Sequence, residues 1–95
     1  MTDTSEVQQE GYSFLNMSTT VSTVIKSGNG VLHAIVINTG AAGIVTIYDN
    51  TAGSGTKIAT LKTGITERTL IYDLKFDNGL YVIPAAAVNV TYIYC

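Results

Sequence analysis

The sequence has 95 residues, of which 46% are hydrophobic and only 13% charged, about half the usual charged fraction of roughly 25%. The formal net charge is −2, and no cluster of Lys or Arg exists that would follow a phosphate backbone, which argues against nucleic-acid binding. The apolar runs are too short to span a bilayer and the first residues are too polar for a signal peptide, so we expect no membrane segment.

A flexible acidic arm is predicted at residues 1–11. Asp3, Glu6 and Glu10 lie there without any Lys or Arg beside them, whereas the remaining four acids and five bases leave the rest of the chain near neutral. The segment shows no hydrophobic period and ends at Gly11. We assign residues 12–95 to a single domain.

The body of the chain is predicted to be all-β. Fourteen threonines and many Val and Ile residues favour extended chain, because β-branched side chains suit a pleated surface. Turn signals recur about every 8–12 residues, which is typical of a small antiparallel β-sandwich, jelly roll or barrel with seven or eight strands. Strands are predicted at residues 12–17, 19–26, 31–38, 44–49, 57–61, 68–76, 80–83 and 88–94.

Several of these strands carry more specific expectations. The first, at 12–17, is either a strand or an arm that docks on a neighbour. Residues 31–38 are apolar on both faces and should be central, with 44–49 as their antiparallel partner. Imperfect alternation predicts a bulge or bend near Asp73, and Pro84 marks a strand end because it cannot donate to a ladder.

The stretch YDNTAGSGTKI, residues 48–58, is polar enough to be considered as a binding loop. Its single carboxylate is too few for calcium, and the order of its glycines and Lys57 is wrong for a phosphate-binding loop. Asp49 and Asn50 can bond nearby backbone, and the glycines allow a tight turn. We therefore expect a hairpin loop, whose neutral tip remains available as a contact surface.

Catalytic and metal sites are not expected. His33 is the only histidine and shares a side with Val31, Ile35 and Ile37 in the predicted strand, as a core or interface residue would. The acids outside the arm lie next to turns or at strand ends, where solvated carboxylates are ordinary. One histidine and one cysteine cannot build a structural zinc site. We expect no enzyme activity, no cofactor and no metal.

Tyrosines and the single cysteine are the candidates for contact with other subunits. Tyr92 and Tyr94 lie two apart and so share a face, where they either pack in the sheet or form a subunit interface or a sugar-stacking platform. Cys95 is expected on a frayed or edge strand, as a free thiol or as an intermolecular disulfide.

The block VLHAIVINTGAAGIVTIYDNTAGSGTKIATL, followed by YDLKFDNGLYVI, resembles small structural proteins of tailed bacteriophages. The likeness covers about residues 30–83 and rests on strand and turn residues, not on catalytic groups. The matching residues are Gly30, Leu32, Ile35, Ile37, Asn38, Ile47, Tyr48, Asp49, Asn50, Thr51, Gly55, Ile58, Phe76, Asn78, Gly79 and Leu80.

The resemblance implies a non-enzymatic virion protein, located on the capsid surface and made in the cytoplasm of the bacterial host. The expected role is decoration or cementing of the capsid through contact with the major capsid protein or another virion protein, as a homo-oligomer with a trimer favoured. A receptor- or glycan-binding module of a fibre or tail appendage is the alternative. The expected interface residues are Glu6, Glu10, Tyr12, Phe14, Leu15, Tyr92, Tyr94 and Cys95.

Overall fold

The computed structural model describes residues 11–39, 43–86 and 88–95, which form eight β-strands and no helix. The all-β expectation is therefore confirmed, and no described segment is a helix that could cross a membrane. The predicted arm, except for Gly11, lies outside the described residues. The strands are β1 (Ser13–Met17), β2 (Thr23–Ser27), β3 (Gly30–Thr39), β4 (Val45–Asp49), β5 (Thr56–Leu61), β6 (Arg68–Phe76), β7 (Gly79–Pro84) and β8 (Asn89–Tyr94).

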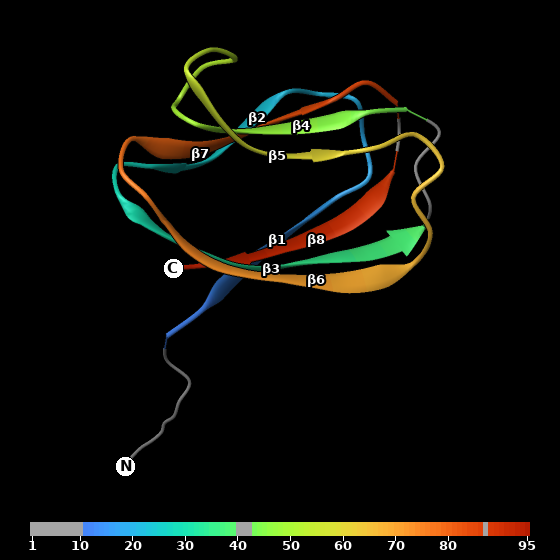
Figure 1. Ribbon diagram of the computed structural model, residues 1–95, viewed down its shortest axis with the longest axis horizontal. Helices are drawn as coiled ribbons and strands as arrows, with labels where there is room; N and C mark the ends of the chain where they lie inside the picture. Colours follow the sequence, from blue (N-terminus) through green and yellow to red (C-terminus); the bar gives the residue numbers. More distant parts are fainter. Residues whose placement is uncertain (1–10, 40–42, 87) are drawn as a thin grey trace.

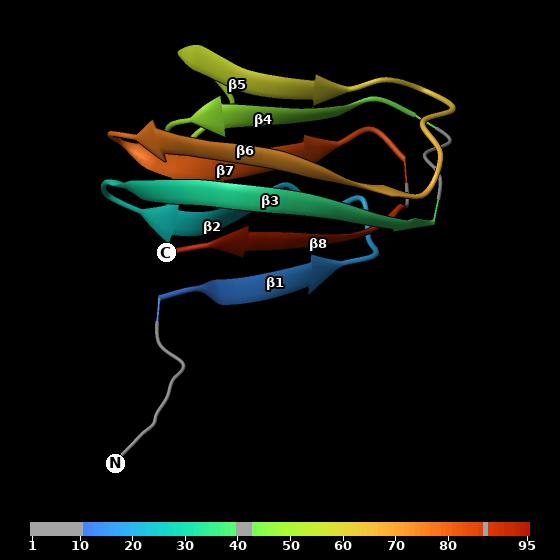
Figure 2. The ribbon, with the colours of Figure 1, turned by 60° about the horizontal axis from the view of Figure 1, so that its bottom comes forward.

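Two four-stranded antiparallel sheets pack face to face (Figure 1). The first sheet has the order β1-β8-β3-β6 and the second the order β2-β7-β4-β5. The chain changes sheet at every connection except the β4–β5 hairpin, which is the interleaved arrangement of a jelly roll. Figure 2 shows that β1 and β2 are the edge strands on one side of this sandwich, and that β6 and β5 are the edges on the other.

The core lies between the two inner faces. Alternating apolar residues of both sheets supply it, as the period of a half-buried strand requires. Each buried core residue is at most 8% exposed. The buried core comprises Met17, Leu32, Ile35, Ile37, Val45, Ile47, Leu61, Phe76, Leu80, Val82, Val88, Val90 and Tyr92.

Two strand expectations need correction. Residues 44–49 do not pair with residues 31–38, because β4 lies in the second sheet between β7 and β5. A glycine-rich turn suits a crossover between sheets as well as a hairpin, so the sequence signal did not separate them. The second strand begins at Thr23 and not at residue 19, because residues 18–22 carry the chain from one sheet to the other.

The central strand and the bulge were predicted correctly. β3 lies between β8 and β6 in the first sheet. Its register shifts between Leu32 and Ala34 against both neighbours. On β6 the irregularity falls at Asp73, whose φ of 46° is unusual for a residue with a side chain.

Candidate interaction surface

The outer face of the first sheet carries an apolar row that crosses all four strands. The row consists of Phe14, Ile93, Ala34 and Ile71, each opposite the next across a strand pair. Phe14 is 72% and Ile71 is 62% exposed, so the row meets solvent at both edges of the sheet. Ala34 is only 1% exposed, since larger side chains flank it on this face. Apolar side chains aligned on an exposed face favour contact with another protein.

An amide strap, made of Asn16, Asn38, Asn89 and Thr91, lies beside this row. Asn16 Nδ2 donates hydrogen bonds to Asn89 Oδ1 at 2.7 Å and to Thr91 Oγ1 at 3.0 Å. From the other side, Asn38 Nδ2 donates to the same two oxygen atoms, both at 3.1 Å. The strap therefore ties β1, β8 and β3 together and presents a neutral polar surface.

A third group, Tyr12, His33 and Asp73, lies on the opposite side of the apolar row from the strap. The rings of Tyr12 and His33 are stacked, with centroids 4.4 Å apart and an interplanar angle of 22°. Nδ1 of His33 is hydrogen-bonded to Asp73 Oδ1. This group fixes the chain just before β1 against β3 and β6.

The placement of His33 corrects the expectation that it shares a side with Ile35 and Ile37. Those two isoleucines are buried in the core, whereas the side chain of His33 is 31% exposed on the outer face. The bulge is the physical reason, because one extra residue in a strand exchanges the faces of the side chains beyond it.

The His33–Asp73 pair has the form of a base and the carboxylate that orients it. Catalysis by such a pair also needs a nucleophile within hydrogen-bond reach of the base. Among the described residues, Asp73 is the hydrogen-bond partner of the His33 ring, and no hydroxyl or thiol bonds to it. That the protein is not an enzyme stays a prediction.

The outer face of the first sheet carries no Asp, Glu, Lys or Arg on β1, β8 and β3. The Lys, Arg, Asp and Glu residues of this sheet are Arg68, Asp73 and Lys75, and all three belong to β6. No pocket forms in the part of the chain that the structure describes. Within that same part, no group of three or more His, Cys, Asp and Glu side chains gathers. The face is therefore suited to contact across a broad surface.

The predicted interface residues are divided between this face, the core and the undescribed arm. Tyr12 and Phe14 are exposed on the outer face, while Leu15 points inward and packs against the core. Tyr92 is 1% exposed and Tyr94 packs against the core, so in this structure both have the sheet-packing role. Burial also raises the pKa of the Tyr92 hydroxyl above its ordinary value.

The remaining predicted residues are Glu6, Glu10 and Cys95. Glu6 and Glu10 lie outside the described residues. Cys95 is exposed with a free thiol, but it does not belong to a frayed or edge strand, because β8 is an inner strand of its sheet. Its backbone N–H donates to Val31 O at 3.0 Å, and its carbonyl accepts from Val31 N at 3.2 Å.

Sequence reasoning missed Ile71 and the members of the amide strap. Ile71 was placed in a strand, but its face depends on the bulge two residues later. Asn16, Asn38 and Asn89 stand at the ends of predicted strands, where asparagine is read as a turn residue. Their convergence depends on β1 and β3 both pairing with β8, which local pattern does not reveal.

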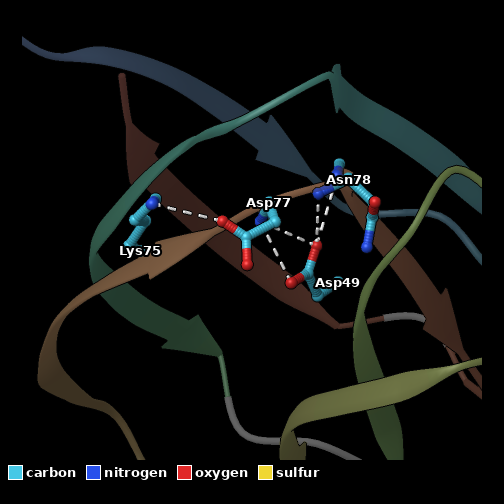
Figure 3. Close-up of polar contacts among 5 residues, drawn as sticks. Asp49, Lys75, Asp77 and Asn78 are labelled. Carbon is cyan, nitrogen blue, oxygen red and sulfur yellow. Dashed lines mark hydrogen bonds and ion pairs between the residues drawn. The ribbon is translucent and has the colours of Figure 1, made fainter.

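The stretch at residues 48–58 forms the β4–β5 hairpin loop, as expected, and Asp49 has a further role. Its carboxylate accepts hydrogen bonds from the N–H of Asn78 at 2.7 Å, of Asp77 at 3.0 and 3.1 Å and of Gly79 at 3.3 Å (Figure 3). We call this contact the turn latch, since it ties the start of the hairpin loop to the β6–β7 turn. The Asp77 side chain instead points toward Lys75, 3.4 Å away.

The electrostatics and packing of the turn latch are those of a structural clamp. Burial of the Asp49 carboxylate raises its pKa, but the hydrogen bonds from Asn78, Asp77 and Gly79 outweigh this, so the pKa lies below its ordinary value. The backbone approaches closely there: a Cβ at Gly79 would lie 2.7 Å from Asn50 O and 2.9 Å from Lys26 O. The loop itself is closed by Asn50 Nδ2, which donates to Ser54 O at 2.8 Å.

Comparison with known proteins adds evidence about the fold only. No family model matches the chain, and no curated protein matches it. One similar solved structure comes from work on Bacillus endospore appendages described as disulfide-linked pili; it has a TM-score of 0.52 and 12% identity, over 88% of this chain and 80% of that chain. Another is the core of Drosophila NLP, described in terms of pentamer formation and histone binding; it has a TM-score of 0.52 and 16% identity, over 90% of this chain and 95% of that chain. At these identities the chain is similar to both in fold alone.

Proposed function

We propose that this chain is a non-enzymatic phage virion protein that decorates or cements the capsid by binding the major capsid protein or another virion protein. The observation that carries the proposal is the outer face of the first sheet, which has no Asp, Glu, Lys or Arg on three of its four strands and combines the apolar row with the amide strap. A cement protein needs such a face on a rigid small body. The resemblance of residues 30–83 to tailed-phage structural proteins supplies the virion context.

The capsid-binding proposal has a direct test. Capsids purified from a deletion strain of the virus that encodes the chain are mixed with the protein and sedimented, and their resistance to heat is measured. We expect saturable binding that raises the temperature at which the capsids break. The Ile71→Lys variant should bind at least about tenfold more weakly, because a charge enters the apolar row without a partner. Thr60→Lys, an exposed change on the outer face of the second sheet, is the matched control.

If the protein does not bind capsids, or if the Ile71→Lys variant binds them as tightly as the wild type, the face does not have this role.

A subunit of a pilus-like polymer is the second candidate function, favoured by the likeness to the endospore appendage structure. The sequence contains one cysteine, so disulfides between identical chains would join them only in pairs. A pilus of this chain would therefore need non-covalent contacts, and electron microscopy of the concentrated protein would reveal the filaments.

A further inference from the structure

The four edge strands of the sandwich differ in how they are protected against pairing with another strand. An edge strand exposes unpaired N–H and C=O groups, and proteins usually blunt it with a charged residue, a proline or a bulge. β2 contains Lys26 and has its irregularity at Ile25, while β5 contains Lys57 and has its irregularity at Ile58. β6 contains Arg68 and Lys75 and has the bulge at Asp73. Three of the four edges thus carry both protections.

β1 carries neither protection. Its five residues, SFLNM, include no charge and no proline. They pair with β8 in unbroken register, from Ser13 opposite Tyr94 to Met17 opposite Val90. Its other side has no strand partner among the described residues. By the criteria of edge protection, β1 is the open edge of this fold.

The surroundings of β1 are also uncharged and apolar. Residues 11–25 include no Asp, Glu, Lys or Arg. This run contributes four of the six exposed large hydrophobic side chains of the described residues, namely Tyr12, Phe14, Val21 and Val24. Because β1 and β2 border the same side of the sandwich (Figure 2), the run follows one continuous side of the molecule.

We infer that β1 pairs antiparallel with β1 of a second copy of this chain, which joins the two first sheets into one eight-stranded sheet across a two-fold axis. This inference rests on the proposed function in taking the chain to be an assembly subunit, and it names the contact between identical subunits. Antiparallel pairing of a strand with its own copy is the isologous arrangement that a two-fold axis produces.

A second copy fits this edge for two reasons. Neither β1 contains a charge that would repel the other. Phe14 is the second of the five β1 residues, so a two-fold axis near the centre of the strand sets each Phe14 against the partner strand on the same outer face. The trimer expected from the sequence would instead require a heterologous contact, in which β1 pairs with a different edge strand of its neighbour. The other described edge strands, β2, β5 and β6, are protected against such pairing by charged residues and bulges.

The test compares Phe14→Lys with Ile71→Lys by sedimentation velocity across a range of concentrations. Both residues are exposed members of the apolar row, but Phe14 lies on β1 and Ile71 lies on the opposite edge strand. We expect a concentration-dependent dimer in the wild type, a dissociation constant raised at least about tenfold by Phe14→Lys, and no effect of Ile71→Lys. Circular dichroism confirms that each variant is folded.

Hydrogen exchange of the wild type provides a measurement that needs no variant. β1 amides that point away from β8 should exchange more slowly as the protein concentration rises. Three results would overturn the inference: a trimer, a dimer that Ile71→Lys dissociates as strongly as Phe14→Lys does, or a wild type that is still monomeric at about 0.5 mM. That concentration is well above the micromolar dissociation constant expected of a small interface. A wild-type dimer that does not bind capsids would remove the proposed function alone and would leave the β1–β1 contact standing.

Discussion

Replacing Asp49 with alanine removes the acceptor that holds the β6–β7 turn, and the geometry of the turn latch gives the size of the effect. The carboxylate receives three backbone N–H groups, of which those of Asn78 at 2.7 Å and Asp77 at 3.0 Å are the closest. A hydrogen bond to a charged group contributes about 1.5–3 kcal/mol, and water replaces part of this at an exposed turn. If each of the two closest donors contributes near the lower end of this range, Asp49→Ala should lower the free energy of unfolding by about 2–3 kcal/mol. In a domain of this size the Tm should fall by about 10–20 °C.

The matched control is Asp77→Asn, which removes a carboxylate from the same turn but keeps the N–H that Asp49 binds. The Asp77 side chain is 70% exposed, and its ion-pair partner among the described residues is the equally exposed Lys75, a kind of ion pair that contributes about 0–1 kcal/mol. Thermal and urea unfolding followed by circular dichroism measure both variants. Equal losses in Asp49→Ala and Asp77→Asn would refute the reasoning, because the latch contacts distinguish them.

The pH dependence of the latch follows from the lowered pKa of Asp49. A carboxyl group whose pKa is lower in the folded state than in the unfolded state stabilises the protein fully above its unfolded pKa, about 3.9, and loses this contribution as the pH falls through the folded pKa. The stability difference between the wild type and Asp49→Asn should therefore be largest near neutral pH and should shrink in acid. A difference that grows as the pH is lowered would contradict the assignment of a charged latch.

Two further predictions concern the core and the start of β1. Ile47→Ala, at a fully buried position between the sheets, should cost about 2–5 kcal/mol in urea unfolding, whereas Ile44→Ala, at a position 46% exposed, should cost less than about 1 kcal/mol. A double-mutant cycle with Tyr12→Ala and His33→Ala should give a coupling free energy of about 0.5–1.5 kcal/mol from the stacked rings, and a coupling of zero would mean that they do not stack in solution.

The strands and the fold class could be predicted from the sequence because they depend on local signals. β-branched residues, alternation and turn residues marked the strands, although residues 12–17 were left open as a strand or a docking arm, and broken alternation around Asp73 marked the bulge. The pairing of the strands could not be predicted in the same way. β4 was expected beside β3 but lies in the other sheet, since the turn chemistry of a hairpin and of a crossover is the same.

The interaction surface was only partly predictable for a related reason. Tyr12 and Phe14 were expected to be interface residues, and both are exposed. The alternation of the last strand correctly put Tyr92 and Tyr94 on one face, but the sequence did not show whether that face was the inner or the outer one. In the structure Tyr92 is buried. The amide strap joins residues up to 75 positions apart in the sequence, so no local sequence pattern could predict it.

The bulge between β3 and β6 connects the exposed face with the open edge. On β3, the extra residue at His33 relative to β8 turns Ile35 and Ile37 inward and sets Ala34 opposite Ile93. The extra residue of β6 then brings Ile71 opposite Ala34, which completes the apolar row. The same bulge twists β6 and blunts it as an edge. A strand added to the first sheet would therefore meet β1, where Phe14 already extends the row to the border of the sheet. Deleting Asp73 would remove the extra residue of β6 and with it this protection of the edge, whereas His33 would keep its face because β3 has its own extra residue there relative to β8.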